Sequence, residues 1–149
     1  MAAWVARVDE AAVRNTPDID ILILRSDYDR AAAAMSGVGF IPRHDRGIDV
    51  FLDGPDAKVR DAVHVIYANE KVKSDSLIES PDVTSCEQAQ KFRLVNLDGL
   101  VLMKLAAFRD KDRMHLRDML EVGLIDETWC GRFPAELGRR LQELVDNPE

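Results

Sequence analysis

Residues 18–24 read Asp-Ile-Asp-Ile-Leu-Ile-Leu, and this stretch decides most of what the rest of the sequence means. Its β-branched and aliphatic side chains predict a β-strand. Because successive side chains of a strand point to opposite faces, Asp18 and Asp20 are expected to project together from one face. The opposite, buried face is then expected to carry the alternating residues Ile19, Ile21 and Ile23.

The two carboxylates have a chemical use if they lie this close. Like charges on neighbouring side chains repel, and a cation between them relieves the repulsion. Hard oxygen ligands favour Mg²⁺ or Mn²⁺, which binds one or two carboxylates together with phosphate oxygens of a substrate. The pair therefore indicates a divalent cation site. The alternative is that both aspartates stand in water at the start of a strand.

The segments on either side of this strand predict helices. Residues 2–14 carry apolar side chains at three- and four-residue spacing, and Thr16-Pro17 is expected to end that helix. Downstream, Ser26 with an aspartate three residues later resembles a capping box, which predicts a helix over residues 27–36. Gly37 then ends it.

The remaining sequence predicts short strands followed by helices. Strands are expected at residues 40–44, 48–52, 62–68 and 92–95, with a turn at 53–56 and a surface loop over 69–90. Helices are expected at residues 97–108, 112–122, 126–131 and 134–145, with Gly123 closing the second. This order predicts an α+β (mixed α/β) fold in a single domain over residues 1–149, with residues 95–149 as its helical part.

Composition agrees with a globular, soluble protein. The chain has 149 residues, of which 46% are hydrophobic and 32% are charged, so one domain with a sizeable core is expected. No apolar run approaches the roughly 20 residues that a membrane span needs. Cys86 and Cys130 are too few and too far apart for a disulfide framework or a zinc site, and a cytoplasmic location is expected.

The charge is unevenly distributed along the chain. The net charge is −7, which disfavours general DNA binding. Residues 91–118 contain seven basic and four acidic residues, so this stretch is +3 and the rest of the chain is −10. A basic face on an acidic body suits a small phosphorylated ligand better than a nucleic-acid duplex. The alternative is an ordinary solvated helix surface.

Lys104 interrupts an apolar stripe in the expected helix at 97–108. At 100° per residue it shares a face with Leu97, Leu100, Val101 and Phe108. A lysine in such a stripe must extend to the surface, pair with an acid or meet an anionic ligand. The three histidines, His44, His64 and His115, do not have the spacing of a zinc site.

Two blocks of the sequence together resemble a known family. The first is Arg14-x-Thr16-x-Asp18-Ile19-Asp20-Ile21, and the second runs from Leu97 to Met119 through Met-Lys-Leu and Phe-Arg-Asp-Lys-Asp. In this order they resemble the minimal nucleotidyltransferases of the DNA polymerase β superfamily. The branch they resemble most is the bacterial toxin type that includes AbiEii and DUF6036-like proteins. The resemblance covers residues 14–123.

The resemblance implies an activity and roles for particular residues. Asp18 and Asp20 would be the catalytic pair that holds Mg²⁺ or Mn²⁺, and the metal would hold a nucleoside triphosphate. A nucleoside monophosphate would then be transferred to an acceptor hydroxyl on RNA or protein. Four basic or polar residues are expected to contact the nucleotide: Arg14, Thr16, Lys104 and Arg109.

Two departures from the family pattern leave the enzymatic activity open. The family has a Gly-Gly or Gly-Ser turn ahead of the first acid, whereas the first glycine here is Gly37. The family's third acid lies on a later strand, where this chain offers either the strand with His64 or the earlier Asp49. Asp49 is therefore a third candidate metal ligand. The alternative is a catalytically degenerate binding or regulatory module, for example one partner of a toxin–antitoxin pair. A third interpretation is an unrelated α+β domain whose aspartates lie at the surface. A protein partner or a homo-oligomer is expected in addition to the nucleotide.

Overall fold

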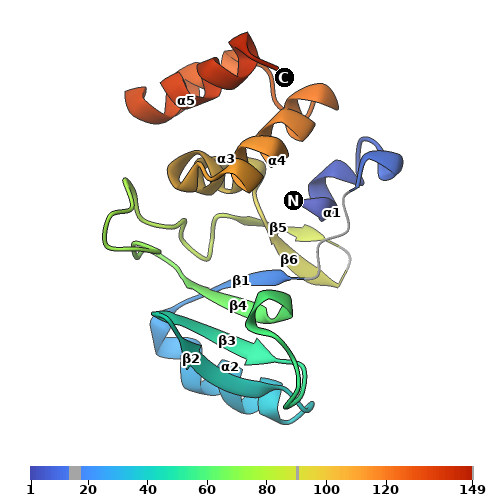
Figure 1. Cartoon of the computed structure of the whole chain (residues 1–149), viewed down its shortest axis with the longest axis vertical. Coiled ribbons are helices and arrows are strands. Elements are labelled where there is room, and N and C mark those ends of the chain that lie inside the picture. Colours follow the sequence, from blue (N-terminus) through green and yellow to red (C-terminus); the bar gives the residue numbers. More distant parts are fainter. Residues whose placement is uncertain (14–17, 90, 149) are drawn as a thin grey trace. The chain divides into compact units, whose positions relative to one another are not determined.

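A computed structural model of the chain describes residues 1–13, 18–89 and 91–148 (Figure 1). They form two compact units. The helical unit comprises Met1–Asn15, Ser76–Ile78 and Ser85–Glu149, and the sheet unit comprises Thr16–Asp75 and Glu79–Thr84. The fold is α+β, as predicted, with a mixed four-stranded sheet, a two-stranded sheet and C-terminal helices.

The sheet unit is built on four strands in the order β1-β4-β3-β2. These are β1 (Ile19–Ile23), β2 (Ile41–Asp45), β3 (Ile48–Leu52) and β4 (Val63–Tyr67). Strand β1 runs parallel to β4, whereas β3 is antiparallel to both of its neighbours. The β2–β3 hairpin needs only a tight turn at residues 46–47, where Arg46 and Gly47 both have positive φ.

The register of these strands determines which side chains share a face. Asp20 pairs with His64 on β4, and His64 pairs in turn with Val50 on β3, so these three lie on one face. The opposite face carries Phe51, and helix α2 (Tyr28–Ser36) packs against it (Figure 1). The apolar contacts of α2 are made by Tyr28, Ala31, Ala32 and Met35. A one-residue shift in any strand would exchange the two faces.

The helical unit consists of short N-terminal elements, a hairpin and three longer helices. The hairpin pairs β5 (Cys86–Ala89) with β6 (Phe92–Val95). The long helices are α3 (Leu97–Ala107), α4 (Asp110–Glu121) and α5 (Ala135–Asp146), and a 3₁₀ helix, η4 (Glu127–Arg132), precedes the last. Asn96 accepts a hydrogen bond from the Gly99 amide and so caps the first turn of α3.

The core of the helical unit combines residues from both ends of the chain. Trp4, in helix α1 (Ala2–Val5), packs in the same buried cluster as Leu105 of α3, Leu116 of α4 and Leu141 of α5. Its indole Nε1 donates to the carbonyl of Val95 over 3.0 Å. The bond satisfies a buried polar group and ties the N-terminal segment to β6.

Most expected elements are confirmed, but two are wrong. The expected helix over residues 2–14 stops at Val5, and the described part of the segment ends in a 3₁₀ helix, η1 (Glu10–Ala12). The Asp9 side chain accepts from the Ala11 amide, which competes with continuation of the helix. The expected loop over residues 69–90 contains β5, whose sequence Cys-Glu-Gln-Ala lacks the side chains typical of strands.

Two further details bear on the expectations. Ile19, expected on a buried face, is 60% exposed because it stands at the start of the edge strand. Among the described residues, no helix combines the length and the apolar character that crossing a bilayer requires.

Candidate functional site

Asp20 and His64 lie side by side on the face of the sheet opposite α2. They are direct partners on the parallel strands β1 and β4, and 3.5 Å separates Asp20 Oδ1 from His64 Nδ1. The Asp20 side chain is 62% exposed, whereas that of His64 is only 21% exposed. An anionic oxygen accessible to solvent is therefore held next to a mostly buried imidazole.

A backbone carbonyl fixes the orientation of the His64 ring. Nε2 lies 2.7 Å from the carbonyl oxygen of Val59, which belongs to the 3₁₀ helix η3 (Val59–Asp61). Because a carbonyl oxygen only accepts, Nε2 carries the proton of this bond. In the neutral imidazole the other nitrogen, Nδ1, then presents its lone pair toward Asp20.

Asp18 directly precedes β1 and is partly buried. The next residue, Ile19, still donates its amide to the carbonyl of Ala62 over 3.4 Å, so the chain runs beside β4 at this point. Arg14 and Thr16, expected to contact a nucleotide, lie outside the described residues.

The structure does not bring Asp49 together with Asp20. Asp49 is adjacent to Val50 and so occupies the α2 face of the sheet, whereas Asp20 occupies the other. Its two carboxylate oxygens have partners there: Tyr67 Oη donates to Oδ2 over 2.6 Å, and His44 Nδ1 lies 2.8 Å from Oδ1. Burial raises the pKa of Asp49, but the bonds from Tyr67 and His44 outweigh it and hold the pKa below its usual value.

The residue next to Asp20 is thus a histidine rather than a third acid. Of the two alternatives for the third-acid position, the strand with His64 is the one that lies beside β1. Within residues 1–13, 18–89 and 91–148, no three histidine, cysteine or acidic side chains are grouped closely enough to hold a metal ion on their own. Any cation at Asp20 would need ligand atoms from a substrate or solvent as well.

Sequence reasoning missed a second polar group on the α2 face. The Arg25 guanidinium lies 3.8 Å from the centre of the Tyr67 ring and binds both carboxylate oxygens of Glu70. Burial, followed by the bond to Asp49, raises the pKa of Tyr67. No sequence motif predicts that Arg25, Tyr67 and Glu70 lie together, because these residues meet only through the pairing of β3 with β4 and the turn after β4.

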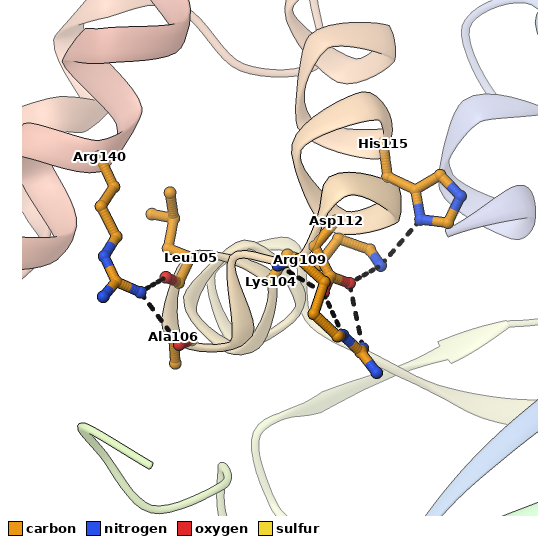
Figure 2. Close-up of polar contacts among 7 residues, drawn as sticks. All are labelled: Lys104, Leu105, Ala106, Arg109, Asp112, His115 and Arg140. Atoms are coloured by element: carbon orange, nitrogen blue, oxygen red, sulfur yellow. Dashed lines mark hydrogen bonds and ion pairs between the residues drawn. The ribbon is translucent and has the colours of Figure 1, made fainter. Parts of the chain in front are cut away.

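In the helical unit, Lys104 pairs with residues of α4 (Figure 2). Its Nζ lies 3.4 Å from Asp112 Oδ1 and 3.0 Å from His115 Nδ1. The Lys104 side chain is 14% exposed and that of Asp112 is 2% exposed. The lysine in the apolar stripe is thus balanced by a buried acid within its own unit.

Arg109 joins the same cluster from the turn between α3 and α4. Its Nε donates to Asp112 Oδ2 over 2.6 Å, and its backbone amide donates to the same oxygen over 3.3 Å (Figure 2). Burial raises the pKa of Asp112, yet the Arg109 hydrogen bonds and the nearby Lys104 charge hold it below the usual value. Asp112 therefore stays ionised and caps the start of α4.

His115 is neutral in this cluster at neutral pH. Burial, reinforced by the Lys104 charge, lowers the pKa of His115 to about 4. The neutral ring can accept a hydrogen bond at Nδ1 from the lysine ammonium. Lys104, Asp112 and His115 are here called the buried cluster, in which the Lys104 ammonium contacts both the carboxylate and the imidazole.

Arg140 of α5 completes the polar contacts around α3. Its guanidinium donates to the carbonyls of Leu105 and Ala106 over 2.8 and 3.1 Å (Figure 2). Carbonyls at the end of a helix lack partners within it. The next residue, Phe108, has φ +46° and turns the chain into α4. Arg140 thus stabilises this turn, on which the buried cluster depends.

Comparison of the chain with protein-family models, with curated proteins and with solved structures gave no match.

Proposed function

We propose that the sheet unit binds the divalent cation of a nucleoside triphosphate through Asp18 and Asp20. The observation that carries the proposal is the exposed Asp20 carboxylate on the face opposite α2. An exposed carboxylate two residues from a second one is the donor set that a metal–phosphate complex uses. The resemblance of residues 14–123 to nucleotidyltransferases adds the expectation that the phosphates belong to a nucleotide.

Transfer would make this protein an enzyme. An acceptor hydroxyl oxygen would attack the α-phosphorus in line and form a new P–O bond, while the bond to pyrophosphate breaks and the hydroxyl proton passes to solvent water. A bound Mg²⁺ or Mn²⁺ would neutralise part of the negative charge on the phosphates. In this scheme Asp18 and Asp20 position the complex. Lys104 and Arg109 belong to the helical unit, where both contact Asp112.

One observation favours a second function, binding without efficient transfer. The position next to Asp20 is occupied by His64, and the other candidate acid, Asp49, lies on the opposite face with both oxygens bonded. A third carboxylate would favour deprotonation of the attacking hydroxyl. Its replacement should slow turnover more than it weakens binding. The chain would then act as a regulatory module, for example as one partner of a toxin–antitoxin pair.

Binding is tested by replacing both acids at once. Asp18→Asn with Asp20→Asn should abolish the rise in melting temperature that Mg²⁺ or Mn²⁺ with a triphosphate causes, because ligand binding to the native state is what raises it. Asp53→Asn with Asp56→Asn removes the same charge from two exposed positions of the same unit and should retain the rise. An unchanged rise in the first variant would move the site elsewhere.

Transfer is tested with radiolabelled triphosphates and pooled RNA or protein acceptors. We expect little labelling by the wild-type chain and more by His64→Asp, which places a carboxylate beside Asp20. Strong wild-type labelling that disappears in Asp18→Asn would contradict the binding-only function and establish the enzyme.

A further inference from the structure

Five arginines in the described part of the chain stack on an aromatic ring, and one of them lacks an acidic partner. The other four also pair with a carboxylate: Arg7 on Trp4 with Glu87, Arg25 on Tyr67 with Glu70, Arg132 on Trp129 with Asp98, and Arg140 on Phe108 with Glu136. Arg113 is the exception. Its guanidinium carbon lies 4.5 Å from the centre of the Phe108 ring, but no described residue forms a side-chain hydrogen bond or an ion pair with it.

The Arg113 side chain is partly buried although its charge is not balanced. Its Nε is shielded from solvent and has no hydrogen-bond partner. A guanidinium stays charged at physiological pH, and a charge that leaves water without a counter-charge costs free energy. Contact with the Phe108 ring offsets only part of that cost. The terminal nitrogens Nη1 and Nη2 are not shielded in the same way, so they present charged donors at the surface.

Arg140 brings a second guanidinium to the same ring. Its guanidinium carbon lies 5.0 Å from the centre of Phe108. Nη1 donates to two carbonyls at the end of α3 (Figure 2), and Nε lies 3.7 Å from a carboxylate oxygen of Glu136. Nη2 forms no hydrogen bond with the described residues and is not shielded from solvent. Two positive charges therefore lie close to one aromatic ring, with three terminal nitrogens available between them.

The nearby acid does not balance both charges. Glu136 is shared, because it also pairs with Arg139. Guanidinium groups bind phosphate and carboxylate oxygens through charge-assisted hydrogen bonds. A phosphate monoester offers three terminal oxygens and a charge of about −1.5 to −2, whereas a carboxylate offers two oxygens and a single charge. Two guanidinium groups with three available nitrogens therefore match a phosphate monoester best.

We propose that Arg113 and Arg140, placed around Phe108, form a binding site for a phosphate monoester. The phosphate supplies the anion that Arg113 lacks and that the other four stacked arginines find within the chain. The site lies in the helical unit and uses neither Asp18 nor Asp20, so it does not rest on the proposed function. A small phosphorylated molecule and the phosphorylated end of a nucleic acid both carry this group.

The experiment titrates the full chain with inorganic phosphate at constant ionic strength, with a chelator present so that divalent cations do not contribute. Arg113→Met keeps an apolar side chain that packs on Phe108 but removes the charged donors. Calorimetry should show phosphate affinity at least roughly tenfold weaker in this variant than in wild type. Without phosphate its free energy of unfolding should not fall, because the deleted charge has no partner.

Arg132→Met is the matched control, because Arg132 also stacks on an aromatic ring but is paired with Asp98. It should keep the wild-type phosphate affinity. In the wild-type chain, phosphate should also shift the NMR resonance of the Arg113 Nε–H group, a measurement that needs no folded variant. No phosphate binding by wild type, equal affinity in Arg113→Met, or an equal loss in Arg132→Met would each overturn the proposal.

Two further titrations identify the source of the phosphate. Phenyl phosphate represents a small molecule, and a short single-stranded oligonucleotide with a terminal phosphate represents a nucleic-acid end. Equal affinities support a small ligand, whereas an oligonucleotide that binds at least about tenfold more tightly supports a nucleic-acid end. Equal binding of the oligonucleotide with and without its terminal phosphate would contradict a monoester site. Asp18→Asn with Asp20→Asn should retain phosphate binding, so failure of the cation site contradicts the proposed function alone.

Discussion

The buried cluster of the helical unit and the Asp20–His64 pair of the sheet unit use the same side-chain types in opposite ways. In the buried cluster the cation is the ammonium of Lys104, and the acid that balances it, Asp112, is almost fully buried. In the sheet unit a backbone carbonyl orients His64, and the acid beside it is mostly exposed. The comparison predicts that the first group contributes to stability, and it leaves the second with an accessible carboxylate.

Breaking the buried cluster should have the largest effect. Asp112→Asn keeps the side chain's size but leaves Lys104 and Arg109 without their shared anion. We expect the free energy of unfolding to fall by about 2–4 kcal/mol, because a buried charge loses its partner. Urea denaturation measures it. Asp110→Asn, at an exposed position in the first turn of the same helix, should change stability by less than about 0.5 kcal/mol.

Replacing Lys104 should lower the free energy of unfolding less than replacing Asp112 does, which separates the contribution of the lysine from that of the acid in the buried cluster. Lys104→Met keeps most of the stem but deletes the donor to Asp112 and His115, and Arg109 still binds the acid. We expect stability to fall by about 1–2 kcal/mol.

Titration calorimetry on the same variant decides whether Lys104 also serves a ligand. If Lys104 contacts phosphate, its replacement should weaken triphosphate binding by roughly 1.5–3 kcal/mol. Equal affinity in wild type and Lys104→Met would remove Lys104 from the nucleotide site. Lys111→Met, an exposed position in α4, is the matched control.

The smallest effect is a pH dependence of stability that comes from His115. Its pKa is lowered to about 4 in the folded chain, against about 6.5 in the unfolded chain. Between these values the unfolded state binds more protons, so stability decreases as pH falls from about 6.5 toward 4. The slope should stay below about 1.4 kcal/mol per pH unit, and partial exposure of the ring reduces it further.

Denaturation curves at several pH values measure that slope. His115→Gln cannot take up a proton and should flatten the curve between pH 6 and 5. An identical slope in the variant would show that other groups cause the acid sensitivity.

The sequence predicts an element's bounds well where the spacing of apolar side chains within a few residues is enough to define it. The strand at residues 48–52 and the strand at 92–95 have the expected bounds, because alternating apolar side chains and the Asp53-Gly54 turn define them locally. The pairing of β1 with β4 then places Asp20 and His64 on one face, but the exposure of Asp20 comes from its position near the start of the edge strand, where Ile19 is exposed as well.

The face of Asp49 could not be predicted in the same way. It depends on whether Val50 or its neighbour pairs with His64, and a local sequence pattern does not specify register between strands 14 residues apart. The buried cluster also depends on non-local geometry. Asp112 and His115 reach Lys104 only because the chain turns at Phe108, whose positive φ a phenylalanine rarely adopts.

The core of the helical unit has a consequence for the order of events during synthesis. Three of the leucines that Trp4 clusters with, Leu137, Leu141 and Leu144, are synthesised more than 130 residues after it. The sheet unit, whose four strands lie between residues 19 and 67, has all of its strands long before then. The growing chain can therefore form its candidate site before α5 is made, whereas Trp4 gains its full set of core partners only after α5 has been synthesised.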